Sequence, residues 1–473
     1  MNSIINQKSF FASSLTRYNK FQSFRTFHDW LNKCCRPDEF RVELVPLDMM
    51  ENWGLDKDGV RISHDSGKFF YIEGIHVKTN FGGELEWDQP IINQPEIGFL
   101  GFITRVYDGI RYFLVQAKME PGNINTLQIS PSLQATKSNF TQVHKGKRPT
   151  FLEFFNGERK VKILSDHLQT EQGGRFYQKR NRNIVIEIDE DIELPDEFCW
   201  LTLGELKALL REDNVLNMDT RSVLSTIPLI EDEVINHLQP FDLFDLRATI
   251  SHNGEKFLKS FVSKDSVNTI DDLLSWYTKQ KTQWEIEVKK KPLCQLEGWK
   301  INKMAVESTD RYFSVIGVKV TAGTREVTHW MQPLLKDSNI GLLAFICQEI
   351  NGVLHFMVQA KVEPGNLDII ELSPSVSCSN YEYRKNNGNK PIMFDAVFDN
   401  QSTVMYDALQ SEEGGRFYQI QNRNMIVEIP ESVYIELPYN YTWMTLAQMK
   451  EFMRYGMFNI EARSLISAIS FID

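Results

Sequence analysis

The sequence lacks the long apolar segments that place a chain in or across a membrane. None of its 473 residues lies in an apolar run of about 18 residues, which a membrane-spanning helix requires. The N-terminal stretch MNSIINQKSFFASSLTRYNKF also lacks the apolar core and the small-residue cleavage pattern of a signal peptide. These two absences predict a cytoplasmic protein.

Cysteine and histidine are scarce, and neither is spaced as a metal ligand or as a disulfide framework. The six Cys form no CxxC pair, and only Cys34 and Cys35 are neighbours. The nine His show no HxH or HExxH spacing. Reduced thiols and the absence of a transition-metal site are therefore predicted.

Positive charge is in deficit, and two common nucleotide-binding fingerprints are missing. The net charge of −11 argues against a nucleic acid or an anionic membrane as partner, because both usually bind to a basic face. Neither GxGxxG nor GxxxxGK[ST] occurs, so neither a Rossmann site nor a P-loop is predicted. With 42% hydrophobic and 24% charged residues, the composition is that of a soluble globular protein.

What the sequence does contain is a long internal repeat. Residues 166–188 (DHLQTEQGGRFYQKRNRNIVIEI) and 407–429 (DALQSEEGGRFYQIQNRNMIVEI) are identical at 15 of 23 positions. The apolar positions drift between the copies, while the polar, aromatic and Gly positions are kept. Core packing alone tolerates many hydrophobic exchanges, so the kept polar set indicates a binding site that occurs twice.

The repeat extends over about half of the chain in each copy. QAKMEPGN at 116–123 returns as QAKVEPGN at 359–366, SPS at 130–132 returns at 373–375, and WLTL at 200–203 returns as WMTL at 443–446. The period is too long for a solenoid, whose units have roughly 20–50 residues. We therefore predict two domains, residues 1–230 and 269–473, joined by a connection at 231–268.

The local signals predict an α+β fold in each half. Each half begins with a capped helix, at 23–31 and 269–277, and closes with a helix that starts at a capping box, TLGE at 202–205 and TLAQ at 445–448. Mixed or antiparallel sheets with flanking helices are favoured over a parallel doubly wound sheet, because strands, hairpin turns and helices alternate irregularly. The predicted strands are 69–77, 97–106, 112–120, 183–188, 312–320, 340–349 and 353–363.

The strand predicted at 112–120 carries polar residues on one face. Side chains alternate along a strand, so Phe113 and its alternate neighbours face the core, while Gln116, Lys118 and Glu120 lie opposite. A solvated face would give the same pattern, but the second copy repeats the row as Gln359, Lys361 and Glu363. We interpret the row as the floor of a polar pocket, in which Lys contacts an anion or acts as an electrophile and Glu acts as a base or acceptor.

The motif EQGGRFY at 171–177 supplies a second group of candidate residues. Its paired Gly permit a tight turn and close backbone approach to a ligand. Arg175 and Arg182 can make bidentate contacts to phosphate oxygens, and Tyr177 can protonate a leaving oxygen. A structural turn with a Glu171–Arg175 salt bridge is the alternative. Trp87 could stack on a base, although packing is the favoured interpretation.

Over residues 24–469 the sequence resembles the NDP-hexose 2,3-dehydratase family. The resemblance rests on five motifs that each occur twice: QAKxEPGN, SPS, LQ[ST]E[EQ]GGRFYQ, NRN[IM][IV][IV]E[IV] and W[LM]TL. The resemblance implies a carbon–oxygen lyase that removes water from dTDP-4-keto-6-deoxy-D-glucose to give a 3,4-diketo-2,6-dideoxy sugar, the first step of C-2 deoxygenation. It also implies two halves with a Nudix-like motif, a homodimer, and no metal or redox cofactor. A downstream 3-ketoreductase is expected to receive the unstable product.

A Nudix hydrolase would need an acidic RExxEE cluster to hold Mg²⁺. Here Glu412-Glu413 is the nearest approach, and the first copy has Glu171-Gln172. Metal-assisted pyrophosphate cleavage is therefore not predicted, so the fold likeness does not carry the hydrolase function with it.

The reaction implied by the resemblance suggests roles for the repeated residues. Glu120 or Glu171 would take the C-3 proton beside the C-4 ketone, and Tyr177 would protonate the leaving C-2 hydroxyl. Lys118 with Gln116 would contact the C-4 oxygen. The remaining predicted substrate-binding residues are Arg175 and Arg182 at the diphosphate, Asn123 and Ser130 near the sugar hydroxyls, Trp87, and in the second copy Gln359, Lys361, Glu363, Asn366, Arg416, Tyr418 and Arg423.

Chemistry is favoured in the N-terminal half, because Tyr112 and Gln172 are replaced by His355 and Glu413 in the second copy. Two other functions use the same residues. One is a nucleotide-sugar-binding protein without turnover, and the other is a sugar-ketone isomerase that passes through the same enolate.

Overall fold

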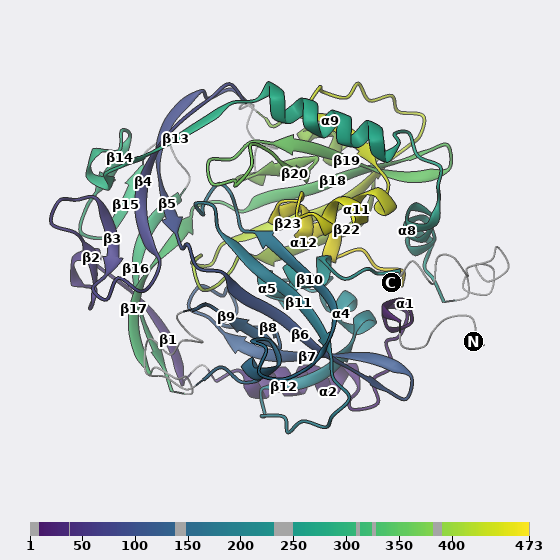
Figure 1. Ribbon diagram of the computed structural model, residues 1–473, viewed down its shortest axis with the longest axis horizontal. Helices are drawn as coiled ribbons and strands as arrows, with labels where there is room; N and C mark the ends of the chain where they lie inside the picture. The colour runs from purple at the N-terminus through teal and green to yellow at the C-terminus, as the bar shows by residue number, and fades with distance from the viewer. Residues whose placement is uncertain are drawn as a thin grey trace.

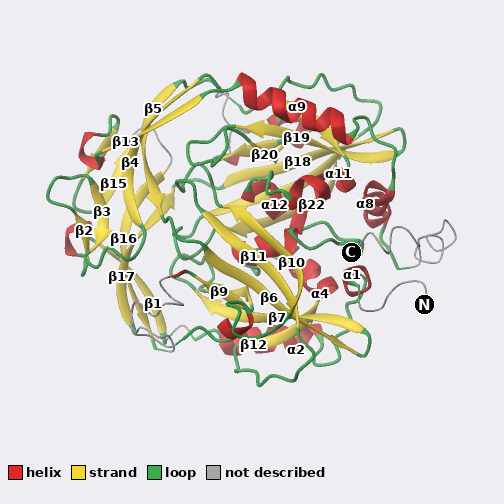
Figure 2. Cartoon of the chain, in the orientation of Figure 1, coloured by secondary structure: helices red, strands yellow, loops and turns green. Residues whose placement is uncertain are grey.

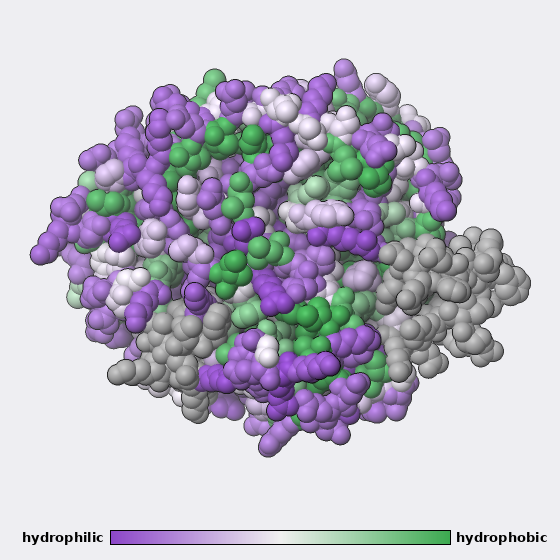
Figure 3. Space-filling view, in the orientation of Figure 1, coloured by the Kyte–Doolittle hydropathy of each residue, from purple (hydrophilic) through white to green (hydrophobic). Residues whose placement is uncertain are grey.

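The computed structural model describes residues 9–36, 38–137, 148–230, 249–308, 313–323, 328–381 and 390–472. These residues form an α+β structure in which four sheets are flanked by short helices, as predicted (Figures 1 and 2). The described part contains no helix that is both long and apolar enough to span a membrane. The face drawn in Figure 3 is mostly hydrophilic, with separate hydrophobic patches. The six cysteines are unpaired.

The first half contains the predicted opening helix, the predicted strands and the capping-box helix. Thr202 and Glu205 form the capping box of α4 as predicted. The elements are α1 (Phe10–Ser14), α2 (Phe24–Cys34), β1 (Phe40–Val45), β2 (Trp53–Leu55), β3 (Arg61–His64), β4 (Tyr71–Thr79), β5 (Glu86–Asn93), β6 (Gly98–Tyr107), β7 (Ile110–Met119), β8 (Leu127–Pro131), β9 (Leu133–Ala135), β10 (Lys162–Thr170), β11 (Arg180–Glu187), β12 (Phe198–Thr202), α4 (Leu203–Leu209) and α5 (Met218–Ser225).

The second half repeats this order. Thr445 and Gln448 form the second predicted capping box. The elements are α8 (His252–Val262), α9 (Ile270–Gln283), β13 (Ile286–Lys291), β14 (Trp299–Ile301), β15 (Ala305–Ser308), β16 (Phe313–Ala322), β17 (His329–Asp337), β18 (Gly341–Ile350), β19 (Val353–Lys361), β20 (Glu371–Pro374), β21 (Val376–Cys378), α10 (Phe394–Val397), β22 (Thr403–Ser411), β23 (Gln421–Ile429), β24 (Tyr441–Met444), α11 (Leu446–Arg454) and α12 (Ile460–Ser467).

Each half has a seven-stranded mixed sheet. The first has the order β10-β11-β6-β7-β12, with β8 beside β7 and β9 beside β6, and the second has the equivalent order β22-β23-β18-β19-β24, with β20 beside β19 and β21 beside β18. The pairs β6–β11 and β18–β23 are parallel, while the other pairs are antiparallel. The duplication is therefore visible in strand order and in strand direction.

The two five-stranded sheets exchange a strand between the halves. Strand β1 of the first half pairs with β16 of the second, from Phe40 opposite Ala322 to Val45 opposite Gly317. Strand β13 of the second half pairs in turn with β4 of the first, from Ile286 opposite Thr79 to Lys291 opposite Gly74. In Figure 1 these exchanged strands lie on the left, away from the seven-stranded sheets. Neither sheet is complete with residues of one half alone.

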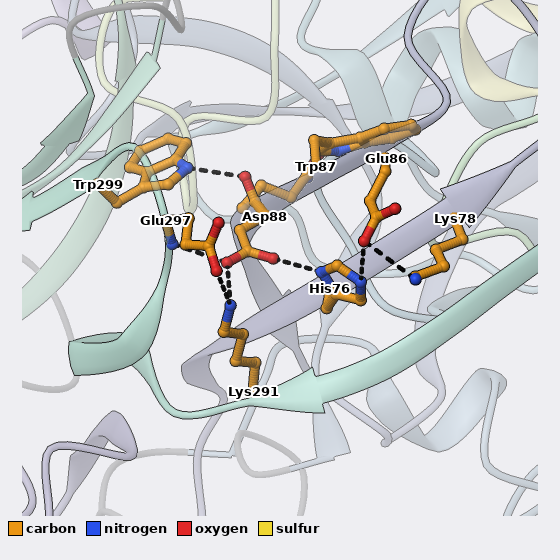
Figure 4. Close-up of polar contacts among 9 residues, drawn as sticks. His76, Lys78, Glu86, Trp87, Asp88, Lys291, Glu297 and Trp299 are labelled. Atoms are coloured by element: carbon orange, nitrogen blue, oxygen red, sulfur yellow. Dashed lines mark hydrogen bonds and ion pairs between the residues drawn. The ribbon is translucent and has the colours of Figure 1, made fainter.

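A buried carboxylate fixes the exchanged strand β13 (Figure 4). Asp88 on β5, with a side chain that is 1% exposed, accepts from Lys291 Nζ at 2.6 Å and from the backbone N–H of Glu297 at 2.7 Å. Its other oxygen lies 2.7 Å from His76 Nδ1, and its carbonyl accepts from Trp299 Nε1 at 2.8 Å. The network joins β4 and β5 of the first half to β13 and β14 of the second.

The halves also share a hydrophobic core. The largest buried cluster combines residues of both seven-stranded sheets, such as Phe113 and Phe356, with α5 and α12 between them (Figure 1). Two fully buried arginines tie the halves together there. Arg221 of α5 donates to the carbonyl of Ser411, and Arg463 of α12 donates to the carbonyl of Thr170.

Helix α8 lies within the predicted connection at 231–268 and contacts the second half, because its Ser260 Oγ donates to the carbonyl of Leu354 at 2.6 Å. On β7, Tyr112 and Leu114, which precede the predicted polar row, lie in a separate buried cluster.

Candidate functional site

The two most similar motifs of the repeat meet across the halves. The backbone N–H of Gly122 donates to the carbonyl of Gly414 at 2.7 Å, and the N–H of Gln419 donates to the carbonyl of Gly122 at 2.7 Å. A Cβ at Gly122 would lie 1.6 Å from the Phe417 carbonyl oxygen, so only glycine permits this approach. Gly365 repeats both contacts with Gly173 and Gln178. EPGN of each half therefore docks on GGRFYQ of the other, and two composite sites result.

The first composite site, which we call the Glu120 cluster, is built from three parts of the chain. Its members are Lys118, Glu120, Gln134, Asp219 and Glu413. Glu120 is buried at the end of β7 and accepts from Gln134 Nε2 at 3.0 Å through one oxygen. Its other oxygen is buried without a hydrogen-bond partner among the described residues.

Burial raises the pKa values of two carboxyls in this cluster, Asp219 and Glu413. It raises the pKa of Asp219 well above its usual value, and the nearby charges of Glu413 and Glu171 raise it further. Burial likewise raises the pKa of Glu413. Buried carboxyls with raised pKa values next to a lysine are typical of sites that move protons.

The second composite site, the Glu363 cluster, has the equivalent positions with different side chains. Lys361 Nζ pairs with Glu363 at 2.9 Å and donates to Ser377 Oγ at 3.1 Å, where the first site has Gln134. Burial raises the pKa of Glu461, the equivalent of Asp219, to about 7. Asn366 has a buried side-chain amide without a partner among the described residues.

Glu171 lies between the two sites. Its Oε1 accepts from Asn181 Nδ2 at 2.6 Å, and its Oε2 is buried without a partner among the described residues. Burial, followed by the charge of Glu413, raises the pKa of Glu171 to about 7. At the equivalent place Gln172 Nε2 donates to Glu412 at 2.5 Å. The two equivalent contacts between the halves therefore differ, because one pairs Gln with Glu and the other sets two carboxyls near each other.

A small cavity opens beside Glu120. Its volume is about 150 Å³, and its lining includes Glu120 and Asn123 of the first half with Tyr418 of the second. Tyr177, the expected acid, lies elsewhere, packed near Ile75, Val77 and Ile91 with Lys290 Nζ over its ring at 5.3 Å. The structure therefore brings Tyr418, rather than Tyr177, to the cavity that holds Glu120.

The arginines predicted at the diphosphate already have partners within the protein. Arg182 makes a bidentate pair with Asp166 at 2.8 and 2.5 Å, and Arg423 repeats it with Asp407. Arg175 stacks on the ring of Phe313 of the other half at 3.9 Å. Arg416 stacks in the same way on Phe70 at 4.0 Å. All four guanidinium groups hold loops or halves together in this state.

The remaining predicted residues divide between the site and the scaffold. Asn123 lines the cavity, with its Oδ1 buried and unpartnered among the described residues. Ser130 is fully buried and donates to Gln134 Oε1 at 3.0 Å. Trp87 Nε1 donates to Gln89 Oε1 at 2.8 Å, and Gln89 in turn donates to the carbonyl of Gly174, so this Trp supports the glycine turn. Gln116 and Gln359 are half-buried at equivalent positions of β7 and β19.

Sequence reasoning did not assign a role to Asp219 or Glu413. Asp219 and Glu461 follow the N-cap residues Asn217 and Asn459, in the repeated pattern Asn-x-acid-x-Arg-Ser. That pattern was a usable signal, because an acid is kept there in both copies. No group of three His, Cys, Asp or Glu side chains in the described ranges is arranged to hold a metal ion.

Comparison with known proteins agrees with the repeat. A sequence model of the family NDP-hexose 2,3-dehydratase matches the chain twice, at residues 24–227 and 270–469. The dTDP-4-dehydro-6-deoxy-alpha-D-glucopyranose 2,3-dehydratase of Saccharopolyspora spinosa is 39% identical, with 98% of this chain and 95% of that protein covered. The enzyme of the same name from Amycolatopsis orientalis is 37% identical, with 93% and 89% covered.

Among solved structures, the C. elegans Ap4A hydrolase covers 27% of this chain and 94% of its own, at 11% identity and a TM-score of 0.17. A superposition at that score carries no argument.

Proposed function

The chain belongs to the NDP-hexose 2,3-dehydratase family, and from this premise we propose that it removes water across C-2 and C-3 of dTDP-4-keto-6-deoxy-D-glucose. The product is a dTDP-3,4-diketo-2,6-dideoxyhexose. The structural observation that carries the proposal is the composite cavity in which Glu120 and Tyr418 come together beside the buried carboxyls of the Glu120 cluster.

The reaction needs a base at C-3 and an acid at the C-2 oxygen. The C-3 proton is acidified by the adjacent C-4 ketone, and the unpartnered oxygen of Glu120 is the proposed base. The resulting enolate expels the C-2 hydroxyl, which takes a proton from Tyr418 and leaves as water. The enol product gains a proton at C-2, loses the proton of its C-3 hydroxyl, and becomes the diketone. A positioned base and a positioned acid each contribute on the order of 10²–10⁴-fold in rate.

The negative charge that develops on the C-4 oxygen needs a fixed donor. Lys118 is the proposed donor, because it stands two residues before Glu120 and its Nζ already donates to the carbonyl of Gln134 at 3.2 Å. One positioned donor at a developing oxyanion is worth roughly 3–4 kcal/mol. Asp219 and Glu413, whose pKa values burial raises, would then act as nearby proton donors.

This proposal changes one role that the sequence suggested. Tyr418 replaces Tyr177 as the acid, so the reacting groups come from both halves. Assembly as a homodimer, a cytoplasmic location, and a 3-ketoreductase that consumes the product belong to the same proposal and are supported by the family resemblance.

The test compares Glu120→Gln, Tyr418→Phe and Tyr177→Phe. Each protein is incubated with dTDP-4-keto-6-deoxy-D-glucose, and loss of one water is followed by mass spectrometry. We expect kcat to fall by about 10²-fold or more for the first two variants. Full turnover by both would contradict the assignment. If both composite sites work independently, each of the two Tyr variants should instead keep about half of the wild-type turnover.

A wild-type protein that leaves the mass of the sugar unchanged would contradict the dehydratase itself. That result would favour a binding protein or an isomerase.

A further inference from the structure

A second and larger cavity lies between the halves, away from Glu120. Its volume is about 220 Å³. It opens where the ends of β10 and β11 in the first half face helix α9 and the turn after α11 in the second. The residues that carry the argument are Arg180, Tyr277, Lys281, Glu371 and Gly456.

The cavity holds a cation without a counter-ion. Lys281 pairs with Asp368 at 2.5 Å, so these two charges offset each other. Glu371 is buried and accepts from Thr170 Oγ1 at 3.0 Å, and burial raises its pKa to about 8. The guanidinium of Arg180 takes part in no hydrogen bond or ion pair with the part of the chain that the structure describes. At neutral pH the lining therefore carries one net positive charge, that of Arg180.

The equivalent place in the other copy is closed. There Asn214, the counterpart of Gly456, donates from Nδ2 to Gln421 Oε1 at 2.9 Å, and Gln421 is the counterpart of Arg180. Asn125 Nδ2 donates to the carbonyl of Asn214 at 2.9 Å and completes the contact. In this copy two neutral amide side chains are hydrogen-bonded to each other, and neither carries a charge.

Two differences between the copies create the cavity. Gly456 has no side chain at the place where Asn214 in the other copy has an amide. Arg180 has a guanidinium at the place where Gln421 has the amide that accepts the hydrogen bond. The turn itself has a similar backbone conformation in both copies, with φ of 65° at Gly456 and 59° at Asn214.

We propose that this cavity binds a small ligand through a phosphate or carboxylate oxyanion held by Arg180. A guanidinium presents paired donors that match either group. The walls of Tyr277, Leu168 and Leu367 suit a small organic body attached to the anion. A nucleic acid or a protein would not fit, because the space is small and the chain is acidic overall.

The test transplants the closed arrangement into the open one. The double variant Arg180→Gln with Gly456→Asn copies Gln421 and Asn214, and Asn tolerates the left-handed φ at that position. Binding of inorganic phosphate and of acetate is measured by isothermal titration calorimetry at low ionic strength. Arg159→Gln, which removes an exposed arginine paired with Glu190, is the matched control for a lost positive charge.

We expect the wild-type protein and the control to bind at least one anion, and the double variant to bind it at least tenfold more weakly. Which anion binds identifies the phosphate or the carboxylate as the group recognised. Equal affinity in the double variant, or no binding of either anion to the wild type, would overturn the proposal. If the double variant does not fold, Arg180→Gln alone is measured against the same two outcomes. The dehydration assay is independent of these results.

Discussion

At the scale of single residues, the two copies differ where protons are held. Glu171 and Glu413 stand near each other at one of two equivalent contacts between the halves, while Gln172 and Glu412 share a hydrogen bond at the other. Two neighbouring carboxyls raise each other's pKa, whereas an amide carries no charge that could do so. The difference of one functional group therefore gives the two composite sites different protonation behaviour.

Glu171 predicts a pH dependence of stability. Its pKa rises from 4.5 to about 7 on folding. The folded state therefore binds the proton of Glu171 more tightly than the unfolded chain does. The contribution of this proton to the free energy of unfolding is fully present below about pH 4.5 and is lost as the pH rises to about 7. Each pKa unit corresponds to about 1.4 kcal/mol, so the change is on the order of a few kcal/mol. Urea unfolding of Glu171→Gln and wild type at several pH values measures it.

As the pH rises from about 4.5 to about 7, the free energy of unfolding of Glu171→Gln should increase relative to that of the wild type. A difference in unfolding free energy that stays constant from pH 4.5 to pH 7 would contradict the raised pKa. Glu413→Gln is the companion variant, because it copies Gln172 and removes the charge that adds to the shift of Glu171.

Residue identities indicated which residues are candidates for the site, but not which of them lie together in the folded chain. Gln-x-Lys-x-Glu and GGRFYQ were both recognised as site residues because they recur. Tyr177 and Tyr418 lie in the same six-residue context, however, so no local property shows which of them faces Glu120. Only the docking of Gly122 on Gly414 settles that choice, and it depends on contacts nearly 300 residues apart in the chain.

At the scale of elements, short-range signals were sufficient for the seven predicted strands and for helices α2, α4, α9 and α11, while the other strands, β1 and β13 among them, were not predicted. The Asp-Gly and Asn-Gly turns fixed the hairpins β6–β7 and β18–β19, and the capping boxes fixed the starts of α4 and α11. The exchange of β1 and β13 could not be predicted in this way. Both strands carry similar alternating patterns, so each would fit the sheet of either half.

The network around Asp88 should decide how firmly β13 is held. Asp88→Ala removes the buried partner of Lys291 and of the Glu297 N–H, and we expect it to destabilise the protein by about 3–5 kcal/mol. Glu297→Ala is the control, since its side chain is 90% exposed and it keeps the backbone N–H. We expect that change to cost under about 1 kcal/mol. Urea denaturation of both variants measures the difference, and equal effects would show that the network does not hold the strand.

At the scale of the whole molecule, the halves form one folding unit. They exchange strands, bury Arg221 and Arg463 against each other, and share the largest hydrophobic cluster. The sequence predicted two domains because each copy is long enough to bury a core of its own. Length does not show whether a core is shared, since that depends on which faces meet.

Fragments 1–248 and 249–473 test this unity. Each fragment alone lacks one strand of its five-stranded sheet and exposes an unpaired edge, which favours aggregation. We expect neither fragment to unfold cooperatively by itself, and we expect the co-expressed pair to copurify and to dehydrate the sugar. A single fragment that is monomeric and shows a cooperative thermal transition would contradict a shared fold.

During translation the exchanged strand β1 is made long before its pairing partner. Strand β1 ends at Val45, but its partner β16 ends at Ala322. At about 5–20 residues per second, a ribosome needs on the order of tens of seconds to make the intervening chain. During that interval the nascent chain carries a strand of alternating apolar and charged residues whose pairing partner has not yet been made. Chaperone demand during translation should therefore be concentrated on this early segment and should end when β16 emerges.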